Sequence, residues 1–280
     1  MVNIIVPTDF SNLSKIALKY AIKIANRLNG NITVVHIITI TKAIRISMHA
    51  KMKGLDDNLP TKAQTDLETL IKTISEQYKS THPLKYHVVR GSYFPSTLIE
   101  EAKKQRSGLV VMGTRGATGI TKAVLGSNTA SVIEESHIPV LAVPEDAEFK
   151  GFRNVVYASD LQNLEKELEV LIRYVEKFGS TIHLIHVLPD GQDMHIVEAK
   201  FQRVLRKIAY KNMVTLVLVD TDIESAIDQY VEISKADVLA MFTHEVTFFE
   251  KVFDKSITRK MAFHGKIPLL AFKQDSDLFA

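Results

Sequence analysis

Three glycines after a short apolar run have the greatest potential for chemistry in this chain. Gly113 and Gly116 are separated by two residues, and nine residues separate Gly116 from Gly126, which precedes Ser127 and Asn128. The pattern predicts a strand that passes through a glycine-rich loop into a helix. Glycine allows the backbone to approach a ligand closely, and the N–H groups at a helix start attract anions. The loop could therefore bind phosphate, although two ordinary turns around a short helix would give the same pattern.

The spacing excludes two well-known phosphate loops. A P-loop requires Gly-Lys-Ser/Thr, and none of these glycines is followed by that sequence. A dinucleotide fingerprint requires G-x-G-x-x-G directly after the first strand, whereas these glycines follow a late strand with a different spacing.

Few side chains near this loop could do more than bind a ligand. Asp9 follows the first apolar run and could accept hydrogen bonds from a ribose, hold a metal through water, or cap a helix. Arg115 could neutralise phosphate or be solvated. His36, at the end of another apolar run, is expected to be held by an ordinary hydrogen bond. Because Asp9 is the only acid that we place near the loop, we assign no catalytic residue and no direct metal ligand.

Composition limits the classes of protein to which the chain could belong. Its 280 residues suffice for two domains, and a hydrophobic content of 46% with 24% charged residues is ordinary for a globular protein. The formal net charge of +3 is too small to indicate nucleic acid or a membrane surface. No apolar run approaches the ~18 to 20 residues of a membrane span, and no signal-peptide pattern is present. We expect a cytoplasmic protein whose partners include neither nucleic acid nor a membrane.

Strands and helices are predicted to alternate along the first half of the chain. Ser11 is expected to cap the first helix, Thr61 to open the second, and Thr97 with Glu100 to form a capping box for the third. Residues 39–60 have no clean period and are either a long connection or a cover over a ligand. The predicted strands are Asn3–Val6, Ile32–Ile38, Tyr86–Val89, Leu109–Met112 and Ile138–Val143.

This alternation predicts an α/β fold with a doubly wound, five-stranded parallel sheet of the Rossmann-like kind. The expected strand order is 3-2-1-4-5, which places the ends of the first and fourth strands side by side. Asp9 and the Gly113 loop should therefore meet at that point.

The same pattern then starts again. The segment Asn154–Asn163 matches Asn3–Asn12 at a constant offset, and Ala236–Phe272 aligns without a gap on Ser107–Val143. We therefore expect two tandem domains of one fold, residues 1–147 and 151–280.

The second domain lacks the glycine loop. Phe242, Glu245 and Lys255 stand at the positions of the three glycines. Bulky side chains and a carboxylate would occupy the places where phosphate needs bare backbone, so we expect phosphate binding there to be lost or altered.

The glycine spacing and the opening Pro7-Thr8-Asp9-Phe10-Ser11 together resemble the universal stress protein family, over nearly the whole chain. The resemblance implies a regulatory protein of the stress response that binds ATP, or AMP or ADP, with Mg²⁺, in its first domain only. It also implies that Pro7 and Thr8 line the pocket and that backbone near Ile37 and Met112 flanks the adenine. The expected nucleotide-binding residues are Pro7, Thr8, Asp9, Ile37, Met112, Gly113, Arg115, Gly116, Gly126, Ser127 and Asn128.

The resemblance further implies pairing of domains through their fifth strands, Pro139–Val143 and Pro268–Phe272. We expect an internal pseudo-dimer that is able to form a homodimer. Two alternatives stay open: a slow ATPase or nucleotide-transferring enzyme, and a structural scaffold whose site is a relic.

Overall fold

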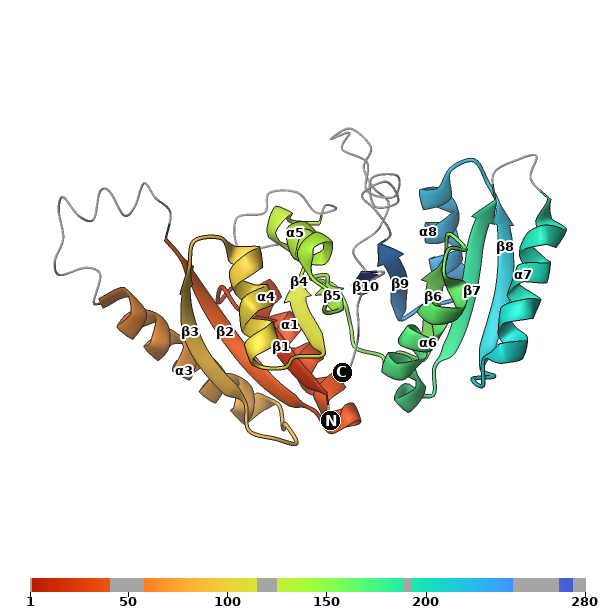
Figure 1. Ribbon diagram of the computed structural model, residues 1–280. Coiled ribbons are helices and arrows are strands. Elements are labelled where there is room, and N and C mark those ends of the chain that lie inside the picture. The colour runs from red at the N-terminus through yellow and green to blue at the C-terminus, as the bar shows by residue number, and fades with distance from the viewer. Residues whose placement is uncertain (1, 41–57, 115–124, 189–192, 244–266, 274–280) are drawn as a thin grey trace. The chain divides into compact units, whose positions relative to one another are not determined.

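The structure is a computed structural model that describes residues 2–40, 58–114, 125–188, 193–243 and 267–273 (Figure 1). The chain divides into two compact units, unit 1 up to Glu145 and unit 2 from Asp146. Each unit alternates strands with helices in the predicted α/β manner. Most of the predicted connection at residues 39–60 lies outside the described residues.

Unit 1 contains a parallel sheet in the order β3-β2-β1-β4-β5, which confirms the predicted order 3-2-1-4-5. The central strand β1 pairs with β2 on one side and with β4 on the other. Its strands are β1 (Asn3–Pro7), β2 (Asn31–Thr39), β3 (Lys85–Gly91), β4 (Leu109–Gly113) and β5 (Val140–Val143). Strand β3 thus runs to Gly91, beyond the predicted end at Val89.

Helices cover both faces of this sheet, and α4 packs against α5 (Figure 1). Ser11 caps α1 as predicted, since its side chain accepts the N–H of Ser14. The helix ends at Asn29 in the left-handed conformation, and Gly30 follows because a Cβ there would lie 2.5 Å from the carbonyl oxygen of Val2. The helices of unit 1 are α1 (Asn12–Leu28), α3 (Asn58–Gln77), α4 (Phe94–Lys104) and α5 (Ser127–Glu135).

Two predicted helix starts were wrong. The second helix begins at Asn58, before Thr61. The third begins at Phe94, with proline in its first turn, where its fixed φ favours helix initiation. Thr97 therefore lies inside α4 and its Oγ1 donates to the carbonyl oxygen of Tyr93, so the capping box does not form.

A buried carboxylate links α4 to the outer strand β3. Glu101 is 6% exposed, and its Oε1 lies 2.9 Å from Nε2 of His87. Burial acts to raise the pKa of Glu101, but hydrogen bonds from Gln105 and His87 and the positive charges of His87 and Lys104 together hold that pKa below its ordinary value.

Unit 2 repeats the topology, with the order β8-β7-β6-β9-β10. Its strands are β6 (Asn154–Ala158), β7 (Thr181–Leu188), β8 (Met213–Val219), β9 (Val238–Thr243) and β10 (Leu269–Lys273). Its helices are α6 (Leu164–Val175), the 3₁₀ turn η1 (Glu176–Phe178), α7 (Met194–Lys207) and α8 (Ile223–Ile233). The predicted pairing of fifth strands concerns the two units together and stays a prediction.

Three phenylalanines hold the segment before β6 against η1. The ring of Phe152 lies 5.1 Å from that of Phe178 and 5.4 Å from that of Phe149. Phe152 is 5% exposed and has a φ of 49°, and Gly151 before it has a φ of 96°. The chain thus becomes part of unit 2 several residues before its first strand.

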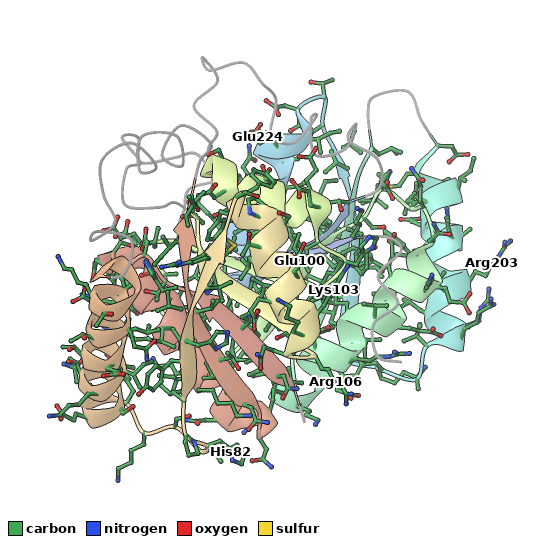
Figure 2. All side chains as sticks on the ribbon, turned by 60° about the vertical axis from the view of Figure 1, so that its left-hand side comes forward. His82, Glu100, Lys103, Arg106, Arg203 and Glu224 are labelled. Atoms are coloured by element: carbon green, nitrogen blue, oxygen red, sulfur yellow. The ribbon has the colours of Figure 1, made fainter. Side chains whose placement is uncertain are left out.

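Charged side chains of both signs cover the outer faces of the helices. Arg203 projects from α7, and Glu100 and Lys103 stand on α4 (Figure 2). No helix in the described ranges is long and apolar enough to cross a membrane.

Candidate functional site

The carboxyl ends of β1 and β4 lie side by side in unit 1. Ile5 of β1 pairs with Val110 of β4, and Pro7 at the end of β1 pairs with Val35 of β2. The sheet thus reverses its winding direction between β1 and β4, and ligands bind at such a switch point in doubly wound folds. The turns that carry Asp9 and Gly113 leave the sheet next to each other.

The turn after β1 is held by a small network of hydrogen bonds. The N–H of Thr8 donates to the carbonyl oxygen of Val35 at 2.9 Å. Its buried Oγ1 accepts the N–H of Phe10 at 3.1 Å and shares a hydrogen bond with Oγ of Ser14 at 3.0 Å. Phe10 has a φ of 65°, a left-handed conformation that is costly for an aromatic residue, and its ring packs 4.6 Å from that of His36. Several contacts together therefore fix the backbone path of this turn.

Asp9 stands at the surface of this turn. Its Oδ1 accepts the N–H of Ser11 at 3.0 Å, which fixes the carboxylate on the outside. The cap of α1 is Ser11, so Asp9 does not have the capping role that we considered. The side chains of Ile37 and Met112, 9% and 5% exposed, lie within β2 and β4, next to the strand ends.

Helix α5 begins directly beside the end of β4. The N–H of Gly126 donates to the carbonyl oxygen of Thr114 at 2.6 Å, and Oγ1 of Thr129 donates to the carbonyl oxygen of Gly113 at 2.9 Å. The two parts of the glycine motif therefore meet in space. Arg115 and Gly116 lie outside the described residues.

The start of α5 is open to an anion. Gly126 is the N-cap, and glycine makes no side-chain bond there. The first bond within the helix runs from the N–H of Ala130 to the carbonyl oxygen of Gly126 at 2.9 Å, so the N–H groups of the three residues between them are not used by the helix. Ser127 and Asn128 are exposed. Such N–H groups, with the helix dipole, favour negative charge.

His36 holds the turn from the neighbouring strand, as predicted for an ordinary hydrogen-bonded histidine. Its Nδ1 lies 2.8 Å from the carbonyl oxygen of Thr8, which can only accept, so Nδ1 carries a proton. His186 makes the same contact with Ser159 at 2.7 Å in unit 2.

The equivalent turn of unit 2 keeps three more of these hydrogen bonds. The N–H of Ser159 donates to the carbonyl oxygen of Ile185 at 2.9 Å, and Ser159 Oγ accepts the N–H of Leu161 at 3.0 Å. Asp160 Oδ1 accepts the N–H of Gln162 at 2.9 Å. The turn is therefore a feature of the fold, and the two units differ at the ends of their fourth strands.

Aromatic side chains fill the corresponding strand ends of unit 2. Phe242, at the position of Gly113, stacks on Phe272 with ring centroids 4.6 Å apart and meets the edge of Tyr157 at 5.6 Å. All three rings are buried. By the same alignment, Tyr157 and Phe272 stand where unit 1 has Val6 and Val143.

Sequence reasoning missed a buried polar pair beneath this stack. The hydroxyl of Tyr157 donates to Oε2 of Glu167, which is 3% exposed, and lies 3.2 Å from Oγ of Ser159. Burial and then the charge of Glu167 raise the pKa of Tyr157 well above its ordinary value. Glu167 stands at the position of Ile16, and a polar residue in place of an apolar one was the available signal.

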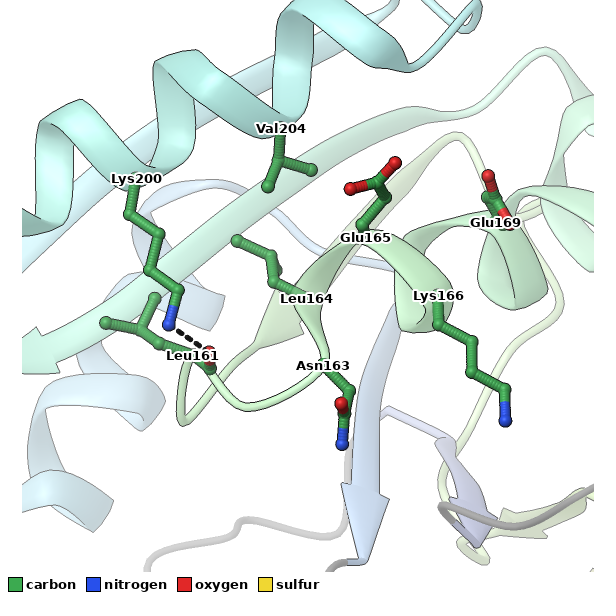
Figure 3. Close-up of a pocket in the computed structure, with 8 residues that line it drawn as sticks. All are labelled: Leu161, Asn163, Leu164, Glu165, Lys166, Glu169, Lys200 and Val204. Carbon is green, nitrogen blue, oxygen red and sulfur yellow. Dashed lines mark hydrogen bonds between the residues drawn. The ribbon is translucent and has the colours of Figure 1, made fainter.

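A shallow depression of about 500 Å³ lies between α6 and α7 of unit 2 (Figure 3). Its ammonium groups are Lys166 and Lys200, and Nζ of Lys200 donates to the carbonyl oxygen of Leu161. Because Glu165 and Glu169 lie beside them, the depression has no clear preference for an anion. Within the described ranges, no group of three His, Asp or Glu side chains could hold a metal ion.

The family model that describes the universal stress protein family matches residues 1–144, more than half of the chain. The chain belongs to the universal stress protein family. A universal stress protein of Synechocystis sp. is 24% identical over 292 aligned positions, which cover 98% of this chain and 100% of that relative.

Solved structures of other universal stress proteins are similar to this chain. One from Archaeoglobus fulgidus is 20% identical with a TM-score of 0.70 and covers 97% of this chain and 98% of its own. Another universal stress protein, in complex with cAMP, is 21% identical with a TM-score of 0.38 and covers 51% of this chain and 96% of its own.

Proposed function

We propose that this universal stress protein is a regulatory protein of the cytoplasmic stress response that binds ATP, or AMP or ADP, in unit 1 only. The supporting observation is the contact of α5 with β4 through Gly126, Thr114 and Thr129. It places an open helix start at the switch point of the sheet, beside the turn that carries Asp9.

The parts of this site fit an adenine nucleotide. The phosphates would be held by the first N–H groups of α5, at Ser127 and Asn128, and by the glycine loop that contains Gly116. The exposed carboxylate of Asp9 would accept hydrogen bonds from the ribose or bind Mg²⁺ through water. Mg²⁺ bound with the nucleotide would neutralise phosphate charge.

Pro7 and Thr8 would line the base of the pocket, and backbone at Ile37 and Met112 would flank the adenine. These residues lie at or near the ends of three neighbouring strands, which supports the assignment. Arg115 would add positive charge near the phosphates.

Unit 2 would not bind a phosphate chain. The ring of Phe242 fills the strand end where Gly113 stands in unit 1, and its stack with Phe272 and Tyr157 could open only with loss of buried contacts. Regulation by binding needs no activated water, and Asp9 is the only acid among the residues that we assign to the site. We therefore expect hydrolysis to be slow or absent.

Titration calorimetry of the full chain tests the proposal with two matched aspartates. Asp9→Ala should weaken ATP binding, whereas Asp160→Ala, in the equivalent turn of unit 2, should leave the affinity unchanged because both aspartates hold their turns in the same way. Gly116→Glu copies Glu245 of unit 2 and should reduce affinity tenfold or more, since one lost amide contact to an anion costs about 1.5 to 3 kcal/mol.

A folded wild-type protein that binds no adenine nucleotide at about millimolar concentration would overturn the proposal. Equal losses in Asp9→Ala and Asp160→Ala would refute the assignment to unit 1. Several turnovers per second, abolished by Asp9→Ala, would favour the enzyme instead.

A further inference from the structure

Strands β3 and β8 occupy equivalent outer positions in the sheets of units 1 and 2. Within the described part of the chain, β3 pairs with β2 and β8 pairs with β7. An outer strand presents a row of N–H and C=O groups that can pair with another chain, and proteins commonly place charged side chains there to prevent it.

Unit 1 has basic side chains on and beside its outer strand, and unit 2 has aliphatic ones at the same positions. A constant offset relates the two strands and the helices that follow them, α4 and α8. Val214, Leu216 and Ile233 are 46%, 39% and 76% exposed. The substituted positions are Lys85, His87, Arg90 and Lys104 in unit 1 and Val214, Leu216, Val219 and Ile233 in unit 2.

The backbone of β8 shows which residues face its open edge. The carbonyl oxygen of Asn212 accepts the N–H of Ile182 in β7 at 3.0 Å. The N–H of Asp220 donates to the carbonyl oxygen of Leu188, also in β7, at 3.2 Å. Even-numbered residues of β8 therefore bond to β7. The backbone groups that point to the open edge belong to Thr215, Val217 and Val219, and to Met213, whose N–H is already bonded to the carbonyl oxygen of Lys211 at 2.9 Å.

We propose that β8 is a dimerisation strand on which a second copy of this chain pairs its own β8, antiparallel, about a twofold axis at Leu216. Thr215 then forms a hydrogen-bonded pair with the partner's Val217. Leu216 meets the partner's Leu216 in a non-hydrogen-bonded pair, and Val214 meets the partner's Leu218. Cross-strand pairs of this kind stabilise a sheet, and here they are apolar on the face toward α8.

Charge complementarity supports this register. Lys211 lies just before β8, and Asp220 and Asp222 lie just after it. An antiparallel partner brings each Lys211 beside the partner's Asp220 and Asp222, at both ends of the contact. A twofold axis shifted by one residue to Val217 would place Val214 opposite the partner's Asp220, which leaves a carboxylate against an apolar side chain.

Antiparallel pairing of two copies through β3 would be unfavourable, so we assign the contact to β8. Its axis would lie at His87, opposite the partner's His87, and Lys85 and Arg90 would both enter the contact. Lys85 and Arg90 are exposed, and His87 is already bonded to Glu101.

Sedimentation velocity of the full chain tests the proposal directly. Wild-type protein should sediment as a dimer, and Val214→Lys with Leu216→His, which copies the residues of β3, should sediment as a monomer with an unchanged circular dichroism spectrum. Lys211→Glu should weaken the dimer, and Lys211→Glu with Asp220→Lys should restore it, because the opposite charges still meet.

Cysteine cross-linking fixes the axis. The chain contains no cysteine, so Leu216→Cys adds a single thiol. Non-hydrogen-bonded residues in antiparallel strands have Cα atoms about 4.5 Å apart, within the range of a disulfide. Mild oxidation should therefore convert Leu216→Cys to a covalent dimer, whereas His87→Cys, at the equivalent place on β3, should stay a monomer.

Three results would each overturn the proposal. These are a wild-type monomer at about 100 μM, a dimer that persists in the Val214→Lys, Leu216→His protein, and Leu216→Cys that cross-links no faster than His87→Cys.

Discussion

Removal of the Tyr157 hydroxyl should destabilise unit 2, because it takes a hydrogen-bond donor away from a buried carboxylate. The side chain is fully buried, and its hydroxyl donates to the carboxylate of Glu167. Tyr157→Phe keeps the ring and its edge contact with Phe242 but leaves the buried carboxylate without this donor. Hydrogen bonds to charged groups contribute about 1.5 to 3 kcal/mol, so we expect a loss of about 2 kcal/mol in the free energy of unfolding. For a unit of this size that lowers Tm by roughly 6 to 10 °C.

Thermal unfolding followed by circular dichroism measures this loss, and an exposed tyrosine provides the control. Tyr93 is 46% exposed and its hydroxyl donates to Oε1 of Glu135 at 2.8 Å. Tyr93→Phe should cost less than about 0.5 kcal/mol because water replaces the bond. Tyr157→Phe with Glu167→Ile should be more stable than Tyr157→Phe alone, since the second change removes the buried charge.

The reasoning would be refuted by a Tyr157→Phe protein that unfolds within about 1 °C of wild type. It would also be refuted if the double variant were less stable than Tyr157→Phe, because Glu167 would then stabilise unit 2 without the tyrosine.

Three further predictions concern glycine, acid and the aromatic stack. Gly30→Ala should lower the free energy of unfolding, measured in urea, by about 1 to 3 kcal/mol, because its Cβ would lie 2.5 Å from the carbonyl oxygen of Val2. The pKa of Glu101 is lowered from 4.5 in the folded state, so its stabilisation is present above pH 4.5 and is lost as the pH falls through the folded pKa; His87→Ala should reduce that loss in acid denaturation curves. Phe242→Gly should cost unit 2 about 3 kcal/mol or more in thermal unfolding and give no ATP binding in calorimetry, since the rest of the glycine loop would still be missing.

The fold was predictable because its signals are local and repeated. Apolar runs of strand length alternate with helical periods. The second half repeats the first at constant offsets, so the same elements are predicted independently in both halves. Helix starts were harder to predict. Thr97 suggested a cap, but the proline at position 95 favours an earlier start, at Phe94.

The position of the candidate site in the fold was predictable from the sequence, but the contacts between its residues were not. Strand order alone brings Asp9 to Gly113, because both residues lie at the ends of strands that meet at the switch point. The Tyr157–Glu167 pair was missed, because a glutamate in the first turns of a helix normally faces solvent. Only the packing of α6 on β6 places that carboxylate against the tyrosine.

The phenylalanine cluster around Phe152 determines where unit 2 can be cut from the chain. A fragment that starts at Gly151 would lose Phe149, whose ring lies 5.4 Å from Phe152 and 6.5 Å from Phe178, and would expose the other two rings. A fragment that starts at Asp146 keeps all three rings and the left-handed bend at Gly151. Ligand measurements on an isolated unit 2 should use the longer fragment, because the shorter one would present an apolar patch that Phe149 contacts in the full chain.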